Sequence, residues 1–395
     1  MREQAWQRFR PSGRQRNGRR SAAASAAVVA VGVMTVGVLA PPAAFAATRP
    51  DTVQQGLSTL VRSDGLPGAL ASVKDREGRA RTYTAGVGDL ATRSKVPMDG
   101  QVRIGSNTKV FTAVVVLQLV GEGKIGLDAT VDTYLPGLVR GKGIDGSAIT
   151  VRQLLQHTSG LPNYTSYLGD DVRYFEPREL LDIALRHEAD FAPGKDWKYS
   201  NTNYVLAGLI VQEVTKRPLA EEIDRRVIKR IGLRHTYFPA PGDATIREPH
   251  PKGYYQDSAG APLLDVTEMD PSWGWAAGQM ISTNSDLDRF FSALLAGRLL
   301  PAAQLAEMRT TVRTERTETT FGPGARYGLG LVSKPLPLSC GGGVYWGHGG
   351  SFPGYETRGG VTDDGRAAHV AVTVQLAGEA ARKRVDHVVE TALCR

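Results

Sequence analysis

The sequence predicts an α+β fold, in which both ends of the chain build one antiparallel sheet and a helical lobe is inserted between them. Strand-like runs occur near residues 69–86 and again near 327–375. The stretch from about 128 to 280 is helical and loop-rich, and residues 106–120 predict one nearly all-apolar helix. This order of strands, helices and strands favours one domain over residues 47–395, with the helical lobe inserted at about 128–280.

The first 46 residues have the pattern of an export signal. Seven arginines precede an apolar run from Ala23 to about Leu39, and Ala44-Phe45-Ala46 fits a cleavage site. We expect cleavage after Ala46 and a secreted, extracellular product. The alternative is an uncleaved membrane anchor, which the short run broken by Pro41-Pro42 disfavours.

Most of the positive charge belongs to this signal. Seven arginines and one glutamate give residues 1–46 a charge of +6, so the net +8 of the chain leaves only +2 for the rest. No Lys/Arg stripe with interleaved aromatic residues occurs, and nucleic acid is therefore not an expected partner.

The elements before the insertion follow from local patterns. Asp51 can cap a short helix that ends near Arg62. Residues 69–73 and 81–86 look like strands around a turn at 75–78, so they are expected to pair antiparallel. Residues 106–120 leave almost no polar face, which predicts a buried helix.

The later elements follow in the same way. Helices are expected over 176–187, 203–215 and 219–231, and Gly232 is expected to end the last. The capping run 282–285 precedes an amphipathic helix, and a shorter helix follows Pro301. Strands are expected over 327–332, 343–346, 355–362 and 368–375, and a helix over 378–392.

The two cysteines, Cys340 and Cys394, are expected to form a disulfide, because a pair in an exported protein usually bridges. Two free buried thiols are the alternative. The chain has no His/Cys cluster, His-Glu-x-x-His motif, P-loop or dinucleotide fingerprint. Neither a metal nor an organic cofactor is expected.

A Ser-x-x-Lys motif opens the buried helix. Ser106 and Lys109 are three residues apart and share one helical face. A serine hydroxyl needs a base to become a good nucleophile, and a lysine can be that base if burial lowers its pKa. The helix N-terminus also offers N–H groups to an oxyanion. A chance motif is the alternative, but a lysine inside an apolar helix requires a reason.

Tyr199-Ser200-Asn201 is a second candidate, just before an expected helix. In an extended segment Tyr199 and Asn201 point the same way, toward one cleft. A nearby protonated lysine would favour a Tyr199 phenolate that shuttles a proton, and Asn201 would offer its amide to a substrate carbonyl. The run also suits a plain helix cap.

Gly347-His348-Gly349-Gly350-Ser351 is a third candidate. Gly349 and Gly350 would let a ligand approach the strand edge closely. The N–H of Ser351 would pair with that of Ser106 as an oxyanion hole, and His348 would tune the local field near neutral pH. A glycine-rich hairpin turn is the alternative.

The order Ser-x-x-Lys, Tyr-x-Asn, His-x-Gly resembles the class C β-lactamase and penicillin-binding serine hydrolase family, most closely its secreted D-alanyl-D-alanine carboxypeptidases. The resemblance covers nearly the whole mature chain and includes the stretch from His157 to Leu161. It implies a β-lactamase/transpeptidase-like fold, with a five-stranded antiparallel sheet flanked by helices and an active site between the sheet and a mostly helical lobe.

The resemblance also implies roles for single residues. Ser106 is acylated, Lys109 and Tyr199 move protons, Asn201 holds the substrate amide, Ser106 and Ser351 form the oxyanion hole, and Trp273 lines the acyl pocket. His157 and Ser159 are implied to be structural. The cysteine pair matches a disulfide of the carboxypeptidase branch.

Two positions depart from this pattern. Gly349 stands where the family has Thr or Ser, and Val332 stands where the carboxypeptidase branch has an arginine. Lys334 or Arg358 could supply the missing charge. Each lost charge-assisted hydrogen bond costs about 1.5–3 kcal/mol. Both departures weaken recognition of a free carboxylate and leave the acylation residues untouched.

The sequence therefore predicts a serine hydrolase that forms an acyl-enzyme. The first hypothesis is a D-Ala-D-Ala carboxypeptidase that acts on peptidoglycan stem peptides as a monomer. A β-lactamase, or an esterase or D-aminopeptidase of the same fold, is the enzymatic alternative, and Gly349 favours the latter. A penicillin- or peptidoglycan-binding module without activity is the non-enzyme alternative.

Overall fold

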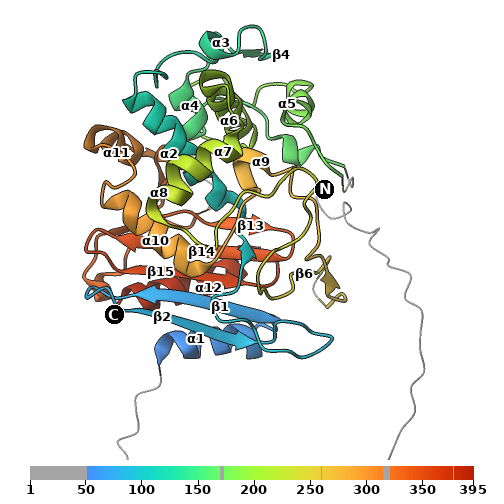
Figure 1. Cartoon of the computed structure of the whole chain (residues 1–395), viewed down its shortest axis with the longest axis vertical. Coiled ribbons are helices and arrows are strands. Elements are labelled where there is room, and N and C mark those ends of the chain that lie inside the picture. Colours follow the sequence, from blue (N-terminus) through green and yellow to red (C-terminus); the bar gives the residue numbers. More distant parts are fainter. Residues whose placement is uncertain (1–50, 170–172, 259, 315–320, 377) are drawn as a thin grey trace, which may run out of the picture.

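The computed structural model describes residues 51–169, 173–258, 260–314, 321–376 and 378–395. The expected export signal, residues 1–46, lies outside these ranges. The described residues form a lobe that contains the sheet, in the lower part of Figure 1, and a mostly helical lobe above it. Within the described residues, no helix combines the length and the apolar character needed to cross a bilayer.

The main sheet joins the two ends of the chain. Strands β1 (Gly68–Lys74) and β2 (Ala80–Gly86) form an antiparallel hairpin, and β1 also pairs antiparallel with β15 (Ala367–Val372). On its other side β15 pairs with β14 (Tyr355–Thr362). The expected antiparallel sheet from both chain ends is confirmed.

The sheet continues beyond β14 in shorter strands. These are β12 (Val344–Gly347), β11 (Val332–Pro335), β10 (Arg326–Tyr327) and β9 (Val312–Arg313), while β13 (Gly350–Phe352) pairs separately with β14. The sheet has nine strands in the described residues rather than the five that the resemblance implied. The difference arises because short strands extend one edge and β13 is separate from β12.

The strand expected over residues 327–332 is wrong. Residues between β10 and β11 form a tight turn, in which the Gly328 N–H donates to the Leu331 carbonyl at 2.7 Å. Gly330 has a φ of +81°, and a Cβ there would lie 2.7 Å from the Ala113 Cβ. Close contact with the helical lobe therefore forces a turn that strand-like alternation did not indicate.

Helices cover both faces of the sheet. Helices α1 (Thr52–Arg62) and α12 (Gly378–Leu393) pack together against one face, and α10 (Asn284–Leu295) packs against the other. The Asp51 carboxylate caps α1 by accepting from the Val53 N–H at 3.0 Å, as expected. Helix α2 (Thr108–Gly121), which the Ser-x-x-Lys motif opens, lies on the α10 side.

The helical lobe and its connections contain the remaining elements. The helices are α2 (Thr108–Gly121), α3 (Val131–Tyr134), α4 (Val151–Gln156), α5 (Pro177–Leu185), α6 (Thr202–Thr215), α7 (Leu219–Ile223), α8 (Lys229–Ile231), α9 (Trp275–Gly278) and α11 (Ala302–Arg309). The two-residue strands are β3 (Val102–Arg103), β4 (Arg140–Gly141), β5 (Ile144–Asp145), β6 (Tyr254–Tyr255), β7 (Leu264–Asp265) and β8 (Ile281–Ser282). A π-helical segment, Asp224–Ile228, interrupts the helix expected over 219–231, which ends at Gly232 in a left-handed conformation as expected.

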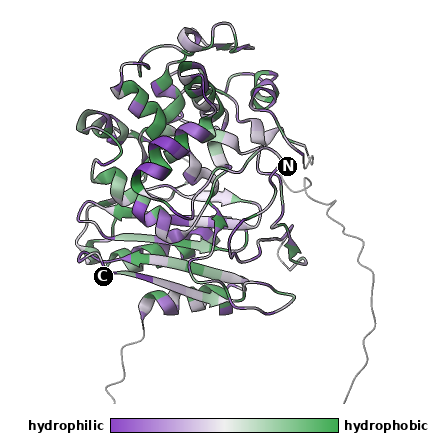
Figure 2. Ribbon diagram, viewed as in Figure 1, coloured by the Kyte–Doolittle hydropathy of each residue, from purple (hydrophilic) through white to green (hydrophobic). Residues whose placement is uncertain are grey.

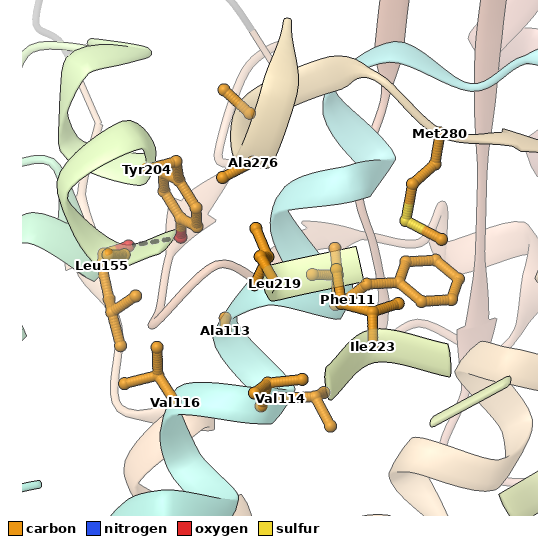
Figure 3. Close-up of a cluster of buried hydrophobic side chains, with 14 of the residues drawn as sticks. Phe111, Ala113, Val114, Val116, Leu155, Tyr204, Leu219, Ile223, Ala276 and Met280 are labelled. Carbon is orange, nitrogen blue, oxygen red and sulfur yellow. Dashed lines mark hydrogen bonds between the residues drawn. The ribbon is translucent and has the colours of Figure 1, made fainter. Parts of the chain in front are cut away.

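Helix α2 is the central helix of the core. Its residues from Thr108 to Leu119 are all buried, and Figure 2 shows it as largely hydrophobic. Phe111 stacks on Phe290 of α10 with ring centroids 3.8 Å apart. Around α2, α6 supplies Tyr204, whose hydroxyl donates to the Leu155 carbonyl at 2.9 Å (Figure 3). The apolar packing therefore holds the N-terminal end of α2, with its Ser-x-x-Lys motif, at a defined place between the lobes.

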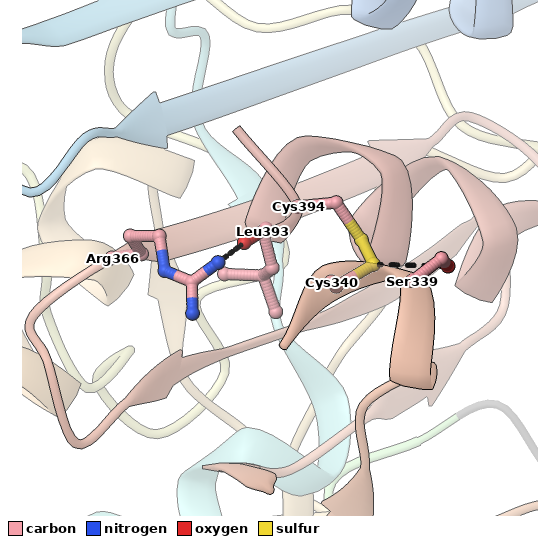
Figure 4. Close-up of a disulfide and its surroundings, with 5 residues drawn as sticks. All are labelled: Ser339, Cys340, Arg366, Leu393 and Cys394. Atoms are coloured by element: carbon pink, nitrogen blue, oxygen red, sulfur yellow. Dashed lines mark hydrogen bonds between the residues drawn. A yellow bond between two sulfur atoms is a disulfide. The ribbon is translucent and has the colours of Figure 1, made fainter. Parts of the chain in front are cut away.

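Cys340 and Cys394 are joined by a disulfide, with their Cα atoms 4.7 Å apart (Figure 4). Cys340 lies in the 3-10 turn Leu338–Cys340, and Cys394 follows α12. Arg366 of the β14–β15 connection donates to the Leu393 carbonyl beside it. The bond fastens the end of the chain to the connection between β11 and β12.

Candidate active site

Ser106 lies in a 3-10 turn, η1 (Gly105–Asn107), between β3 and α2. A Cβ on Gly105 would lie 2.7 Å from the Ser351 carbonyl oxygen and 2.8 Å from the Ser351 nitrogen. A Cβ on Gly350 would lie 1.9 Å from the Ile104 carbonyl oxygen. Only glycines allow η1 and β13 to approach this closely. The contact brings the Ser351 backbone next to the residue that precedes Ser106.

Lys109 is completely buried one turn after Ser106. Its Nζ lies 3.0 Å from Ser106 Oγ, 2.6 Å from Asn201 Oδ1 and 2.8 Å from the Ala277 carbonyl oxygen. Burial lowers the Lys109 pKa well below its usual range. A neutral amine has two N–H groups for the amide and carbonyl oxygens and one lone pair that can face the serine hydroxyl. This arrangement suits a base for Ser106.

Tyr199 comes from the segment that precedes α6, and its ring centroid lies 4.8 Å from Lys109 Nζ. Its hydroxyl is buried and has no hydrogen-bond partner of ordinary geometry among the described residues. Burial raises the Tyr199 pKa, and the neighbouring Ser106 side chain opposes this only in part. The expected phenolate beside a protonated lysine is therefore wrong, because exclusion of water favours a neutral phenol beside a neutral amine.

Asn201 is the N-cap residue of α6, and two segments, α2 and residues 163–165, hold it in place. Its Oδ1 accepts from Lys109, and its backbone N–H donates to Asn163 Oδ1 at 3.0 Å. Its Nδ2 has only a long contact, 3.4 Å, with Thr165 Oγ1. The amide NH₂ is therefore the part of Asn201 that can serve a substrate carbonyl.

His157 supports the Tyr199–Asn201 segment from below. Its Nδ1 accepts from the Ser200 N–H at 3.2 Å and from Asn203 Nδ2 at 2.9 Å, and its ring lies 4.3 Å from the Tyr199 ring. Ser159 Oγ donates to Asn203 Oδ1 at 2.5 Å. Both side chains bind the loop and α6, as the structural role implied for them requires.

His348 is buried beside this group. Its Nδ1 donates to the Gly349 carbonyl, and its Nε2 accepts from the Tyr327 hydroxyl at 3.1 Å. Burial lowers the His348 pKa to about 3, and the charge of the Arg358 guanidinium acts in the same direction. The expectation that His348 tunes the field near neutral pH is therefore wrong. The uncharged imidazole holds the turn between β12 and β13.

Trp273 lies at the opposite end of β13. It is partly buried and stacks on Phe352 with ring centroids 4.7 Å apart, and its carbonyl accepts from the Tyr164 hydroxyl. The two rings form an apolar wall beside Ser351. This is where the resemblance placed the acyl pocket.

Gly349 and Val332, the two positions that depart from the family pattern, have different surroundings. Val332 is buried in β11, and Lys334 pairs with Asp386 of α12 at 2.9 Å, behind the sheet. Arg358 of β14 instead lies directly beside Gly349, because a Cβ there would be 2.1 Å from Arg358 Nη1. Of the two cations considered from sequence, only Arg358 reaches Gly349.

Sequence reasoning missed Glu356, which forms an ion pair with Arg358. Glu356 is fully buried in β14, and its Oε2 accepts from Ser351 Oγ at 2.7 Å. A Glu-x-Arg pair inside the predicted strand 355–362 was the available signal, since alternate strand residues share a face. In the described ranges, no group of three or more His, Cys, Asp or Glu residues is arranged to hold a metal ion.

Comparisons with known proteins show which family the chain is similar to. The family model described as Beta-lactamase matches residues 52–393. Protein flp of Staphylococcus aureus (strain MW2) is 27% identical over 244 residues, which cover 60% of this chain and 48% of that protein. Penicillin-binding protein 4* of Bacillus subtilis (strain 168) is 27% identical over 290 residues, which cover 70% and 61%. The chain thus spans about half the length of the first of these curated relatives and less than two thirds of the second.

Solved structures match over more of their length. A D-stereospecific amidohydrolase from Streptomyces sp. is 40% identical with a TM-score of 0.77, and the match covers 86% of this chain and 98% of that chain. The D-amino acid amidase from Ochrobactrum anthropi SV3, complexed with L-phenylalanine amide, is 27% identical with a TM-score of 0.75, covering 86% and 96%. A penicillin binding protein from Bacillus halodurans, 23% identical with a TM-score of 0.69 over 85% and 98%, shares the fold.

Proposed function

Because the chain belongs to the beta-lactamase family of serine hydrolases, we propose that it hydrolyses amide bonds of D-amino-acid derivatives through an acyl-enzyme on Ser106. One observation carries this proposal: the buried amine of Lys109 joins Ser106 Oγ to Asn201 at 3.0 and 2.6 Å. The 40% identity to a D-stereospecific amidohydrolase over 98% of that chain supports the substrate class.

In acylation, Lys109 takes the proton of Ser106 while Oγ bonds to the substrate carbonyl carbon. The carbonyl oxygen becomes negative and accepts hydrogen bonds from the backbone N–H groups of Ser106 and Ser351. Asn201 offers its NH₂ group to the acyl part of the substrate, which lies along the wall of Trp273.

The carbon–nitrogen bond then breaks. The proton held by Lys109 passes through the Tyr199 hydroxyl to the leaving nitrogen, which departs as ammonia or an amine. Water next attacks the ester on Ser106, and the reverse proton transfer releases the acid and restores the serine. A neutral amine and a neutral phenol can exchange protons in this way without leaving an uncompensated buried charge.

A D-Ala-D-Ala carboxypeptidase that acts on peptidoglycan stem peptides is the second candidate. It uses the same acylation but must also recognise a free carboxylate. Val332 is apolar and Lys334 is engaged by Asp386, so only Arg358 favours this activity. We further propose that residues 1–46 direct export and that the mature enzyme acts outside the cell as a monomer.

The test measures ammonia release from the D- and L-forms of phenylalanine amide, using the chain without residues 1–46. We expect turnover of the D-form, its loss in Ser106→Ala, and its retention in Ser94→Ala, which changes an exposed serine in the connection between β2 and β3. Mass spectrometry after incubation with a labelled penicillin should place an adduct on the Ser106 peptide. Full activity of Ser106→Ala would refute the assignment, and faster turnover of the L-form would refute the D-specificity. Rapid penicillin hydrolysis would instead indicate a β-lactamase.

A further inference from the structure

A chain of polar side chains runs from the exposed Ser351 to the buried Glu356 and Arg358. Ser351 and Glu356 are opposite one another in the antiparallel pairing of β13 with β14. Ser351 Oγ donates to Glu356 Oε2 at 2.7 Å and also accepts from Gln375 Nε2 at 3.2 Å. The Glu356 side chain is only 1% exposed. A carboxylate this deeply buried is retained only with strong partners.

Arg358 supplies the second partner. Its Nη2 donates to Glu356 Oε1, so each oxygen of the carboxylate has its own donor. The guanidinium also fills the space of a side chain at position 349, since a Cβ on Gly349 would be 2.1 Å from Nη1. The missing side chain of Gly349 and the position of Arg358 are therefore two parts of one arrangement. Arg382 of α12, partly buried, is a further cation whose charge acts on Glu356.

Glu356 and Arg358 are on the α12 face of β14, and they reach the site at its edge, through Gly349 and Ser351. At one end of β13, Phe352 stacks on Trp273 and forms the acyl wall. At the other end is Gly349, and the His348 ring beside it lies 6.3 Å from the ring of Tyr199. Tyr199 is the residue that delivers the proton to the leaving nitrogen in the proposed mechanism. A group that leaves from Ser106 therefore passes close to Gly349, Ser351 and Arg358.

We propose that Glu356 is a specificity-determining residue that closes this side of the site to a leaving group with a free carboxylate. The inference rests on the proposed amidohydrolase function. The Glu356 carboxylate already accepts hydrogen bonds from the Ser351 hydroxyl and from Nη2 of Arg358. A substrate carboxylate would need these same donors. The negative charge of Glu356 also repels a second negative charge nearby. The enzyme therefore prefers amides, esters and peptides whose leaving group is uncharged.

The experiment compares two substrates with the same acyl group and the same scissile bond, acetyl-D-alanyl-D-alanine and its C-terminal amide. The readout is the ratio of kcat/KM for release of D-alanine from the acid to kcat/KM for release of D-alaninamide from the amide. Glu356→Gln removes the negative charge and frees Arg358, so the ratio should rise about ten- to a hundredfold, the value of one charge-assisted hydrogen bond. Arg358→Gln keeps the negative charge and removes the cation, so the ratio should fall.

Glu222→Gln is the matched control, because Glu222 is equally buried and pairs with Arg226 in the helical lobe. It should leave the ratio unchanged. A purely structural role of the Glu356–Arg358 pair would lower both activities together in both variants and leave the ratio unchanged, which would overturn the inference. If Glu356→Gln fails to fold, the opposite shift in Arg358→Gln still tests it. If the parental protein cleaves neither the acid nor the amide, the proposed function itself is wrong.

Discussion

Replacing Lys109 by methionine tests the proton transfer on which the proposed mechanism depends. Methionine has a similar length and fits the buried site, but it lacks the amine that lies 3.0 Å from Ser106 Oγ. Positioned general bases contribute about 10²–10⁴ in rate. At 1.36 kcal/mol for each tenfold change, this corresponds to about 2.7–5.4 kcal/mol of the acylation barrier. The predicted result is a variant that folds and acylates at least a hundredfold more slowly.

The assay is the pre-steady-state rate at which a labelled penicillin or an activated D-amino-acid ester acylates Ser106. Lys334→Met is the matched control, because Lys334 is mostly buried and paired with Asp386 behind the sheet. It should acylate at the parental rate. Unchanged melting of the variants would separate chemistry from folding. A Lys109→Met protein that acylates as fast as the parent would refute the assignment of Lys109 as the base.

The same assay has a predicted pH dependence. Only the neutral amine can accept the serine proton, and burial lowers the Lys109 pKa well below its ordinary value of 10.5. The acylation rate should therefore rise with pH through this lowered pKa and then level off. Between the lowered pKa and 10.5 the unfolded chain binds more protons than the native state, so native stability should rise with pH over this window. Lys109→Met should lack this contribution to both curves.

Three further predictions concern the framework of the site. Gly105→Ala should reduce the acylation rate more than it reduces stability. A φ of +47° costs a non-glycine residue about 1–2 kcal/mol of stability, and the added Cβ would also push β13 away from Ser106. Burst kinetics would measure the effect on acylation, and chemical denaturation would measure the effect on stability. Cys340→Ser combined with Cys394→Ser should lower the free energy of unfolding by up to about 4 kcal/mol, since the bond closes a 54-residue separation; equal urea midpoints for parent and variant would contradict this. Phe111→Ala should cost about 3–5 kcal/mol in the same urea titration, because the ring is fully buried and stacked on Phe290.

Much of the fold could be predicted because its patterns are local. The apolar faces of α2 predicted a buried helix, and short segments beside turns predicted β1, β2 and β14 with nearly correct bounds. The turn at Gly328–Leu331 could not be predicted in this way. Its cause is contact with Ala113, a residue far away in sequence, and no local period reports such a contact.

The site shows the same division. The spacing of Ser106 and Lys109 placed both on one helical face, and Tyr199 and Asn201 were expected to share a cleft with them. Their protonation states were predicted wrongly for Tyr199 and His348, because a pKa depends on how completely the assembled lobes exclude water. The extent to which water is excluded cannot be predicted from a sequence motif.

What the sequence by itself determined is the set of reactive groups, their local geometry and the order of the elements that carry them. Only the tertiary structure decided which group sits beside which across the strands. The antiparallel register puts Glu356 opposite Ser351, and the absence of a side chain at Gly349 leaves room for Arg358. This register depends on packing between residues that are distant in sequence, over the whole sheet. The charge on the leaving-group side of the site therefore follows from the fold rather than from any single motif.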